Sequence, residues 1–202
     1  DEEGLYMTEV LEQELQEDQQ PQQLPETAEE AAEQVLAVVP LRGMVIFPHT
    51  ESHLDLGRKF SVQAVQESSR NNTEVILAFQ KNADSTLPEA DNLYEIGVVA
   101  KIKRTITLPT EGMRVLVSGL YPVRVQEYRI GEDKITAVYE RLPQPEYDRD
   151  QLEIKIRALQ HQFEGYLKRS SRVGAEQLNQ IMDAEPLIRQ LDLMCSYLNV
   201  QL

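Results

Sequence analysis

Few residues of this sequence are of types that do chemistry, and the most suggestive group runs from His49 to His53. Two histidines four positions apart with a glutamate between them resemble the His-Glu-x-x-His metal site that metalloproteases build on a helix. Here the glutamate is displaced from its place in that motif, and Pro48 and the strand-like pattern argue against a helix. We therefore expect no metal to bind here.

The other reactive side chains have simple structural interpretations. Cys195 is the only cysteine, which excludes an internal disulfide, and its helical surroundings predict a buried thiol rather than a nucleophile. His161 lies in a polar stretch and should face solvent. The basic run at 101–104 is too short to bind phosphates strongly, so we expect a solvated strand edge.

Neither of two common catalytic arrangements can be recognised. The phosphate-binding pattern Gly-x-x-x-x-Gly-Lys-Ser/Thr does not occur in the sequence. A serine nucleophile with a lysine base cannot be identified from short-range spacing. The sequence therefore predicts no catalytic residue, no cofactor-binding residue and no metal ligand.

The charge distribution narrows the possible partners. The formal net charge is −14, but residues 1–34 hold twelve Asp or Glu and no Lys or Arg, which leaves 22 acidic and 20 basic residues elsewhere. No basic stripe is present for nucleic acid. No apolar run approaches the roughly 18 residues that span a bilayer, and the start lacks a secretory signal. We expect a cytoplasmic protein without membrane or nucleic-acid partners.

The acidic residues 1–34 are expected to form a flexible leader. Apolar residues between Leu5 and Leu15 could share one face of a short helix, and Thr27 with Glu30 forms the pattern of a capping box. A Gln- and Pro-rich linker separates these two stretches. A segment that docks on a neighbouring subunit is the alternative, and the sequence leaves both open.

Residues 35–142 have mostly β patterns. The apolar runs 35–41 and 44–47, closed by Pro40 and Pro48, predict a buried strand with sharp bends, and Gly43 falls where an unusual backbone shape is needed. A helix should follow Arg58 and end at Asn71-Asn72. Further strands are predicted at 75–79, 94–102, 106–108, 113–117, 122–126 and 135–139, which indicates a small barrel-like sheet.

Helical periodicity replaces the β pattern after the prolines at 143 and 145. Helices are predicted at 148–168, at about 175–184 and from near Pro186 onward. The last pattern is still apolar at Leu202, so we expect it to continue in a longer protein.

Three sequence blocks follow one another along the chain. The second block, 91–102, contains Gly97, and the third, 108–119, ends at Gly119. The first block is carried by Pro40, Leu41, Arg42, Phe47, Pro48, Gly57 and Arg58. In this order the blocks resemble the N-terminal substrate-recognition domain of Lon, the ATP-dependent bacterial serine protease, and the resemblance covers roughly residues 35–202.

The resemblance implies an α+β fold. Residues 35–142 would form a β-rich, PUA-like pseudo-barrel with one early helix, and residues 143–202 a helical subdomain. ATP, Mg²⁺ and the serine–lysine pair would belong to later domains of the full protein. One departure concerns Pro122, where the family pattern has an arginine; Arg124 follows two positions later.

The implied function is recognition of unfolded or damaged polypeptides and help in assembling a homohexamer; the fragment alone could form a dimer. Leu108 and Met113 flank a predicted turn, and Leu120 and Tyr121 follow Gly119 at a predicted strand junction. Apolar residues at such places tend to be exposed, so we expect them to contact clients. The alternative is that they cap the core.

Two other functions remain open at this stage. A stand-alone PUA-like module could bind RNA, or the region could serve oligomerisation alone. Binding of unfolded casein favours recognition, whereas binding of RNA without casein favours the first rival.

Overall fold

The computed structural model describes residues 34–82, 84–85, 88–109, 112–170 and 175–198. The acidic leader predicted at 1–34, with its two short helical stretches, lies outside the described residues except for Gln34. Its predicted flexibility stays a prediction.

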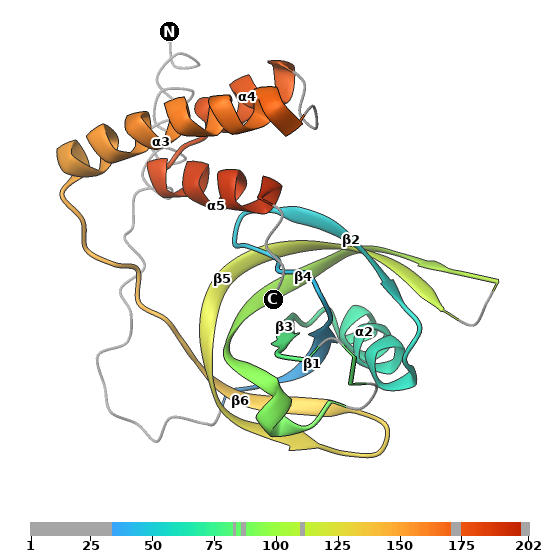
Figure 1. The fold of residues 1–202 in the computed structure, drawn as a ribbon. Helices are drawn as coiled ribbons and strands as arrows, with labels where there is room; N and C mark the ends of the chain where they lie inside the picture. Colours follow the sequence, from blue (N-terminus) through green and yellow to red (C-terminus); the bar gives the residue numbers. More distant parts are fainter. Residues whose placement is uncertain (1–33, 83, 86–87, 110–111, 171–174, 199–202) are drawn as a thin grey trace, which may run out of the picture. The chain divides into compact units, whose positions relative to one another are not determined.

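Six strands form one mixed sheet that curves into a nearly closed ring (Figure 1). The sheet order is β2-β5-β4-β3-β1-β6, and β6 also pairs with β5. β1 and β3 are parallel, and the other pairs are antiparallel. This confirms the predicted β-rich pseudo-barrel. The strands are β1 (Val35–Leu41), β2 (Glu51–Leu56), β3 (Val75–Gln80), β4 (Leu93–Thr107), β5 (Met113–Ile130) and β6 (Ile135–Arg141).

The longest strand, β5, holds the ring together because three other strands pair with it. One edge pairs with β4, and the other pairs with β2 over 113–118 and with β6 over 123–130. Pro122 lies between these two partners, and its carbonyl oxygen accepts the N–H of Leu142 at 3.1 Å. A proline is tolerated there because it lies between the segment of β5 that pairs with β2 and the segment that pairs with β6, where no partner strand needs its N–H. The predicted junction after Gly119 was therefore wrong, and 113–126 belongs to one strand.

The apolar run at 44–47 is a loop, so the prediction of a strand there was also wrong. Ile46 is buried at 2% exposure without strand pairing. The strand is β2 instead, in which Leu54 and Leu56 are buried and Asp55 between them is exposed. Sequence reasoning missed β2 because most of its residues are polar and the alternation is short.

A turn between this loop and β2 packs directly onto β5. The N–H of His49 donates to the carbonyl of Gly119 at 2.9 Å, and the N–H of Gly119 donates to the carbonyl of Thr50 at 2.9 Å. A Cβ on residue 119 would lie 2.4 Å from the carbonyl oxygen of Phe47. Only glycine fits at this crossing, since real Cβ atoms do not approach backbone oxygens so closely.

The central strands are buried on both faces, which divides the apolar core in two. Every residue of β3 is buried: Val75 and Leu77 pack in one cluster, and Ile76 and Ala78 in the other. Helix α2 (Lys59–Asn71) covers the first cluster with its buried face. The predicted doubly covered strand is thus confirmed, as is the helix that ends at Asn71-Asn72.

Arg58 joins the start of α2 to β1 and β3. Its guanidinium donates to the side-chain oxygen of Gln80 at 2.7 Å and to the carbonyl of Pro40, and it lies 5.0 Å from the ring centre of Phe60. Gln80 is only 1% exposed, so water cannot replace the arginine. Burial, with the charge of nearby Arg42 as a second cause, lowers the pKa of Arg58.

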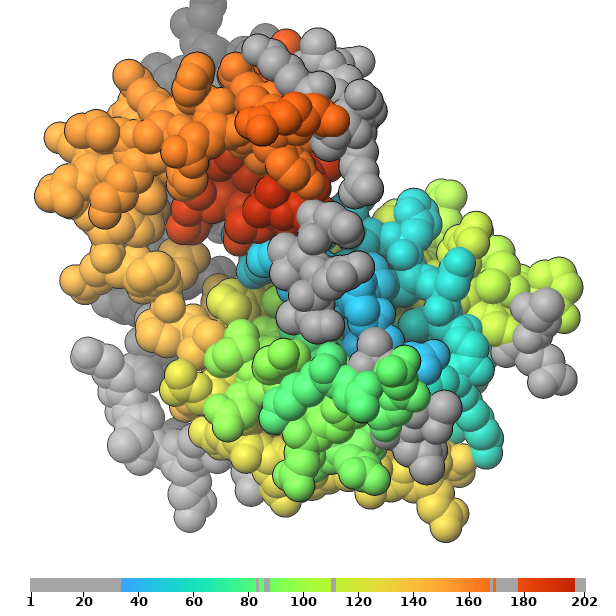
Figure 2. Space-filling view, in the orientation of Figure 1, coloured from blue at the N-terminus to red at the C-terminus, as the bar shows by residue number. Residues whose placement is uncertain are grey.

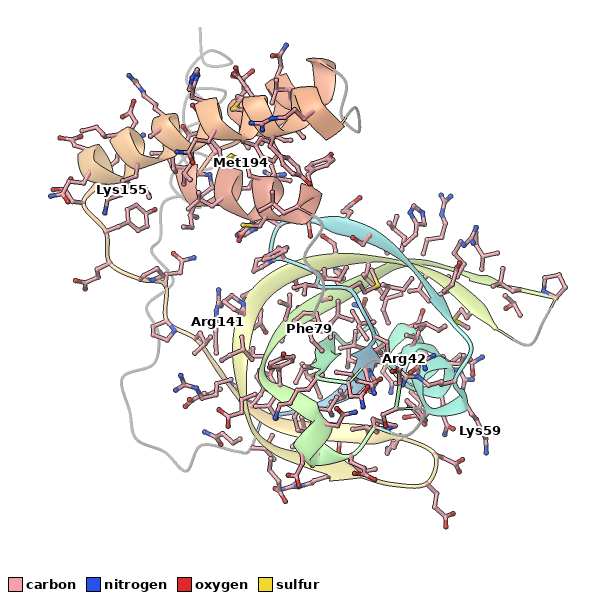
Figure 3. All side chains as sticks on the ribbon, viewed as in Figure 1. Arg42, Lys59, Phe79, Arg141, Lys155 and Met194 are labelled. Carbon is pink, nitrogen blue, oxygen red and sulfur yellow. The ribbon has the colours of Figure 1, made fainter. Side chains whose placement is uncertain are left out.

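Three helices follow the sheet: α3 (Arg149–Ser170), α4 (Ala175–Met182) and α5 (Leu187–Tyr197). The bounds of α3 and α4 and the start of α5 lie within two residues of the predicted ones. The predicted continuation of the last helix to Leu202 and beyond was wrong, because α5 ends at Tyr197. The carboxylate of Asp148 caps α3 by accepting two backbone N–H groups at 2.9 and 3.2 Å. The helices share a cluster that includes Phe163, Ile181 and Met194. Figure 3 labels Met194 on α5. None of the described helices has the length and apolarity to span a membrane.

The contact at Gly119 leads to a stability prediction. Gly119→Ala should lower the free energy of unfolding by about 1–3 kcal/mol, because the new methyl group would overlap the backbone of Phe47. Urea denaturation of the chain measures the change. Gly57→Ala is the matched control, because a Cβ there would meet no atom within 4 Å. Equal stability of both variants would contradict the proposed contact.

Arg58 supports a second stability prediction. Arg58→Ala should cost about 1–3 kcal/mol, because the oxygens of Gln80 and Pro40 would lose a charged donor in a buried setting. Arg114→Ala removes an exposed ion pair with Asp55 and should cost clearly less than Arg58→Ala, because solvent screens exposed ion pairs. Thermal unfolding of both variants makes the comparison, and a larger loss in Arg114→Ala would show that the Arg58 contacts are dispensable.

Candidate functional site

The reactive side chains do not converge on one site. His49 lies in the turn before β2, and His53 lies on the exposed side of β2. Within the described ranges, no three His, Cys, Asp or Glu residues are grouped so that they could hold a metal ion. Cys195 is partly buried, and burial raises the pKa of its thiol, which favours the unreactive protonated form. His161 and the charged residues of 101–104 are exposed.

The four apolar residues predicted to contact clients do not form one exposed patch. Met113 is 5% exposed and belongs to the first core cluster. Leu120 and Tyr121 lie inside the continuous β5 and pack against the second cluster. The expectation of exposure was wrong for Met113, which begins β5 facing inward. Leu120 and Tyr121 are partly exposed, so their contact with clients stays a prediction. Leu108 is half-buried beside the β4–β5 turn.

A different side chain makes the end of the β4–β5 hairpin apolar. Ile106 on β4 is 53% exposed, and its cross-strand partner is the charged Arg114, which is exposed as well. Leu108 lies two residues farther on, where its N–H donates to the carbonyl of Gly112 at 2.9 Å. The sequence contained a signal for the exposure of Ile106. Arg104 lies two residues before it on the same strand face, and a charged residue indicates that this face meets solvent.

A second exposed apolar region is a groove of about 500 Å³ at the β5–β6 hairpin. Figure 2 shows the green segment that precedes β4 lying against the yellow hairpin on the face in view. Ile135 is 1% exposed in this groove, whereas Ile130 is 46% exposed at the end of β5. We call this feature the β5–β6 groove. Its apolar lining consists of Phe60, Pro88, Ala90, Ile130 and Ile135.

The helices carry a third apolar region, a hollow of about 260 Å³ between α3 and α5. Leu159 and Leu198 are 43% and 40% exposed at this hollow, and Phe163 and Met194 are buried beneath them. All three regions offer non-directional apolar contact and lack an arrangement of polar groups for a reaction.

The remaining motif residues have structural roles or line a polar pocket. Phe47 and Pro48 form the turn that crosses Gly119, and a Cβ on Gly97 would lie 2.9 Å from the carbonyl oxygen of Leu77. The first and last parts of the first sequence block meet beside the start of α2. There they line a pocket of about 310 Å³, to which the block contributes Pro40, Leu41, Arg42, Gly57 and Arg58.

Comparison with known proteins identifies relatives over the same residues. The family model described as the ATP-dependent protease La (LON) substrate-binding domain matches residues 35–202. The Lon protease of Syntrophomonas wolfei subsp. wolfei is 34% identical over 167 residues, which cover 83% of this chain and 21% of that protein. The Lon protease of Heliobacterium modesticaldum is 35% identical over 168 residues, which again cover 83% of this chain and 21% of that protein. The chain thus spans about a fifth of the length of these curated relatives.

Solved structures agree on the fold. The N-terminal domain of the Mycobacterium avium complex Lon protease has a TM-score of 0.52 at 14% identity, with 82% of this chain and 100% of that chain covered. The Lon N-terminal domain protein from Xanthomonas campestris has a TM-score of 0.51 at 13% identity, with 82% of this chain and 99% of that chain covered.

The fold and the family match therefore agree with the resemblance carried by the three sequence blocks. They cover the pseudo-barrel together with the helices that follow it. The chain belongs to the family of Lon substrate-binding domains.

Proposed function

We propose that this chain recognises unfolded or damaged polypeptides for a complete Lon protease, through apolar side chains that the folded domain leaves exposed. The observation that carries the proposal is the exposure of Ile106 and Ile130 at the two hairpins that β5 shares with its neighbours. Such contacts are tolerant of sequence, as capture of many different clients requires.

The size of these surfaces predicts weak binding by one domain. Burying the exposed half of an isoleucine side chain contributes about 1 kcal/mol, so two or three such contacts give a dissociation constant on the order of 10 mM. Six linked copies in a homohexamer would raise the effective affinity strongly, because each bound segment keeps the next one close. Assistance with assembly of that hexamer is part of the proposal.

The chemistry of the complete protein would belong to other domains. This sequence has no pattern that would hold the phosphates of ATP with Mg²⁺, so its residues do not fit that cofactor. In the proposal, the chain binds clients in the cytoplasm, and ATP hydrolysis and peptide cleavage take place in later domains.

The hairpin surfaces can be tested by substitution. Ile106→Ser and Ile130→Ser should each weaken binding of fluorescently labelled unfolded casein about fivefold, because each removes a partly exposed apolar contact. Fluorescence anisotropy measures the dissociation constants.

Ile154→Ser is the matched control, because Ile154 is 69% exposed on α3 and lines none of the three apolar regions. It should leave casein binding unchanged. Equal losses in all three variants would contradict the proposed location, and binding of RNA at moderate salt without casein binding would contradict client recognition itself.

A further inference from the structure

The polar pocket beside α2 has no part in the apolar contacts proposed above. We propose that it binds a carboxylate of the client polypeptide, either the C-terminal carboxylate or that of an Asp or Glu side chain. This inference rests on the proposed function, since the ligand is part of the same client. Hereafter we call this feature the α2 pocket.

Two arginines provide positive charge at the α2 pocket. Arg42 is exposed, and no acidic side chain in the described part of the chain forms an ion pair with it. Arg58 uses two of its five N–H donors on Gln80 and Pro40, so further donors remain. The two charges are close enough that Arg42 lowers the pKa of Arg58. Figure 3 shows Arg42 and Lys59 on the side of the barrel that carries α2.

The start of α2 adds a second source of positive potential. The first N–H groups of a helix have no partner within the helix, and the helix dipole is positive at that end. No side chain caps α2, and its first turn contains no acidic residue. Thirteen residues give the helix more than three turns, so the terminus is well formed. An anion at this end would satisfy groups that α2 leaves open.

A buried hydroxyl supplies the independent observation that a ligand is missing. Ser61 is 1% exposed and lines the α2 pocket, and its Oγ has no hydrogen-bond partner among the described residues. A buried polar group without a partner costs free energy, so such groups are normally satisfied. A carboxylate oxygen could accept a hydrogen bond from this hydroxyl.

One acidic residue also lines the α2 pocket, but its charge is neutralised. Asp55 accepts two hydrogen bonds from the guanidinium of Arg114, at 2.6 and 2.8 Å. The hydrogen bond from Arg114 is the main cause of a lowered pKa for Asp55, so this carboxyl stays ionised and paired. The charge of Arg42 therefore stays available for a ligand.

The remaining lining favours a carboxylate on a peptide over a small free anion. The pocket of about 310 Å³ exceeds the size of one carboxylate, and Met44 and Leu54 contribute apolar surface beside the arginines. A peptide carboxylate with an apolar neighbour would fill both parts. Inorganic phosphate would use only the charged part.

The test compares peptides that differ only in charge. A labelled decapeptide with an apolar last residue is prepared with a free C-terminus, as its amide, and as the amide with one internal Asp. We expect the free acid to bind the intact chain about tenfold more tightly than the plain amide, and added salt to weaken it. Tighter binding of the internal Asp peptide would assign the ligand to a side chain instead of the terminus.

Two variants locate the binding. Arg42→Gln should remove most of the difference between acid and amide, and Ser61→Ala should reduce it about threefold. Both should fold, since Arg42 is exposed and the hydroxyl of Ser61 makes no hydrogen bond within the described structure. Arg124→Gln is the control, because Arg124 is similarly exposed and lies outside the pocket. Amide signals of residues 59–61 should shift in NMR spectra when the free acid is added.

The outcomes separate this inference from the proposed function. Equal binding of both carboxylate peptides and the amide would overturn the α2 pocket, as would Arg124→Gln acting like Arg42→Gln. Binding of inorganic phosphate alone at comparable concentration would also overturn the assignment to peptide carboxylates. If casein binding still depends on Ile106 and Ile130, the proposed function survives; if neither casein nor any peptide binds, both fall.

Discussion

The structure depends on backbone hydrogen bonds along both edges of one strand, β5. β4 occupies one edge, and β2 and β6 share the other, so the ring closes only if β5 runs without interruption from Met113 to Ile130. A strand that long must bend, and register shifts occur near Val99, near Ile102 and near Val125. Gly119 admits the crossing turn, and Pro122 stands where the edge changes partner.

The same strand places the surfaces that we assign to client recognition. Its beginning forms a hairpin with β4, which presents Ile106, and its end forms a hairpin with β6, which presents Ile130. At these hairpins Met113 and Ile135 belong to the core clusters, whereas Ile106 and Ile130 stay outside them. These two exposed side chains remain open to solvent while the buried faces stabilise the ring. The surfaces are small, so one domain binds weakly and repetition in an assembly provides the strength.

The α2 pocket differs from these apolar surfaces in its physical basis. Arg58 is held by Pro40 and Gln80, and this buried contact keeps the start of α2 beside the end of β1. Positive charge therefore gathers where the helix terminus is uncapped. Apolar contacts accept almost any unfolded chain, whereas a fixed positive pocket selects for an anionic group. The two together would bind broadly and still orient the client.

Local sequence patterns were enough to predict the family, the positions of the helices and the doubly buried β3. The apolar run at 75–79 predicts a strand covered on both faces, and the helical spacing after Arg58 predicts a helix. The left-handed backbone at Gly43 (φ 65) also follows from residue type. The continuity of β5, the burial of Met113 and the meeting of Arg42, Arg58 and Ser61 in one pocket depend instead on long-range packing. Periodicity separates the two faces of a strand, but which face is covered depends on pairing with residues far away in the chain.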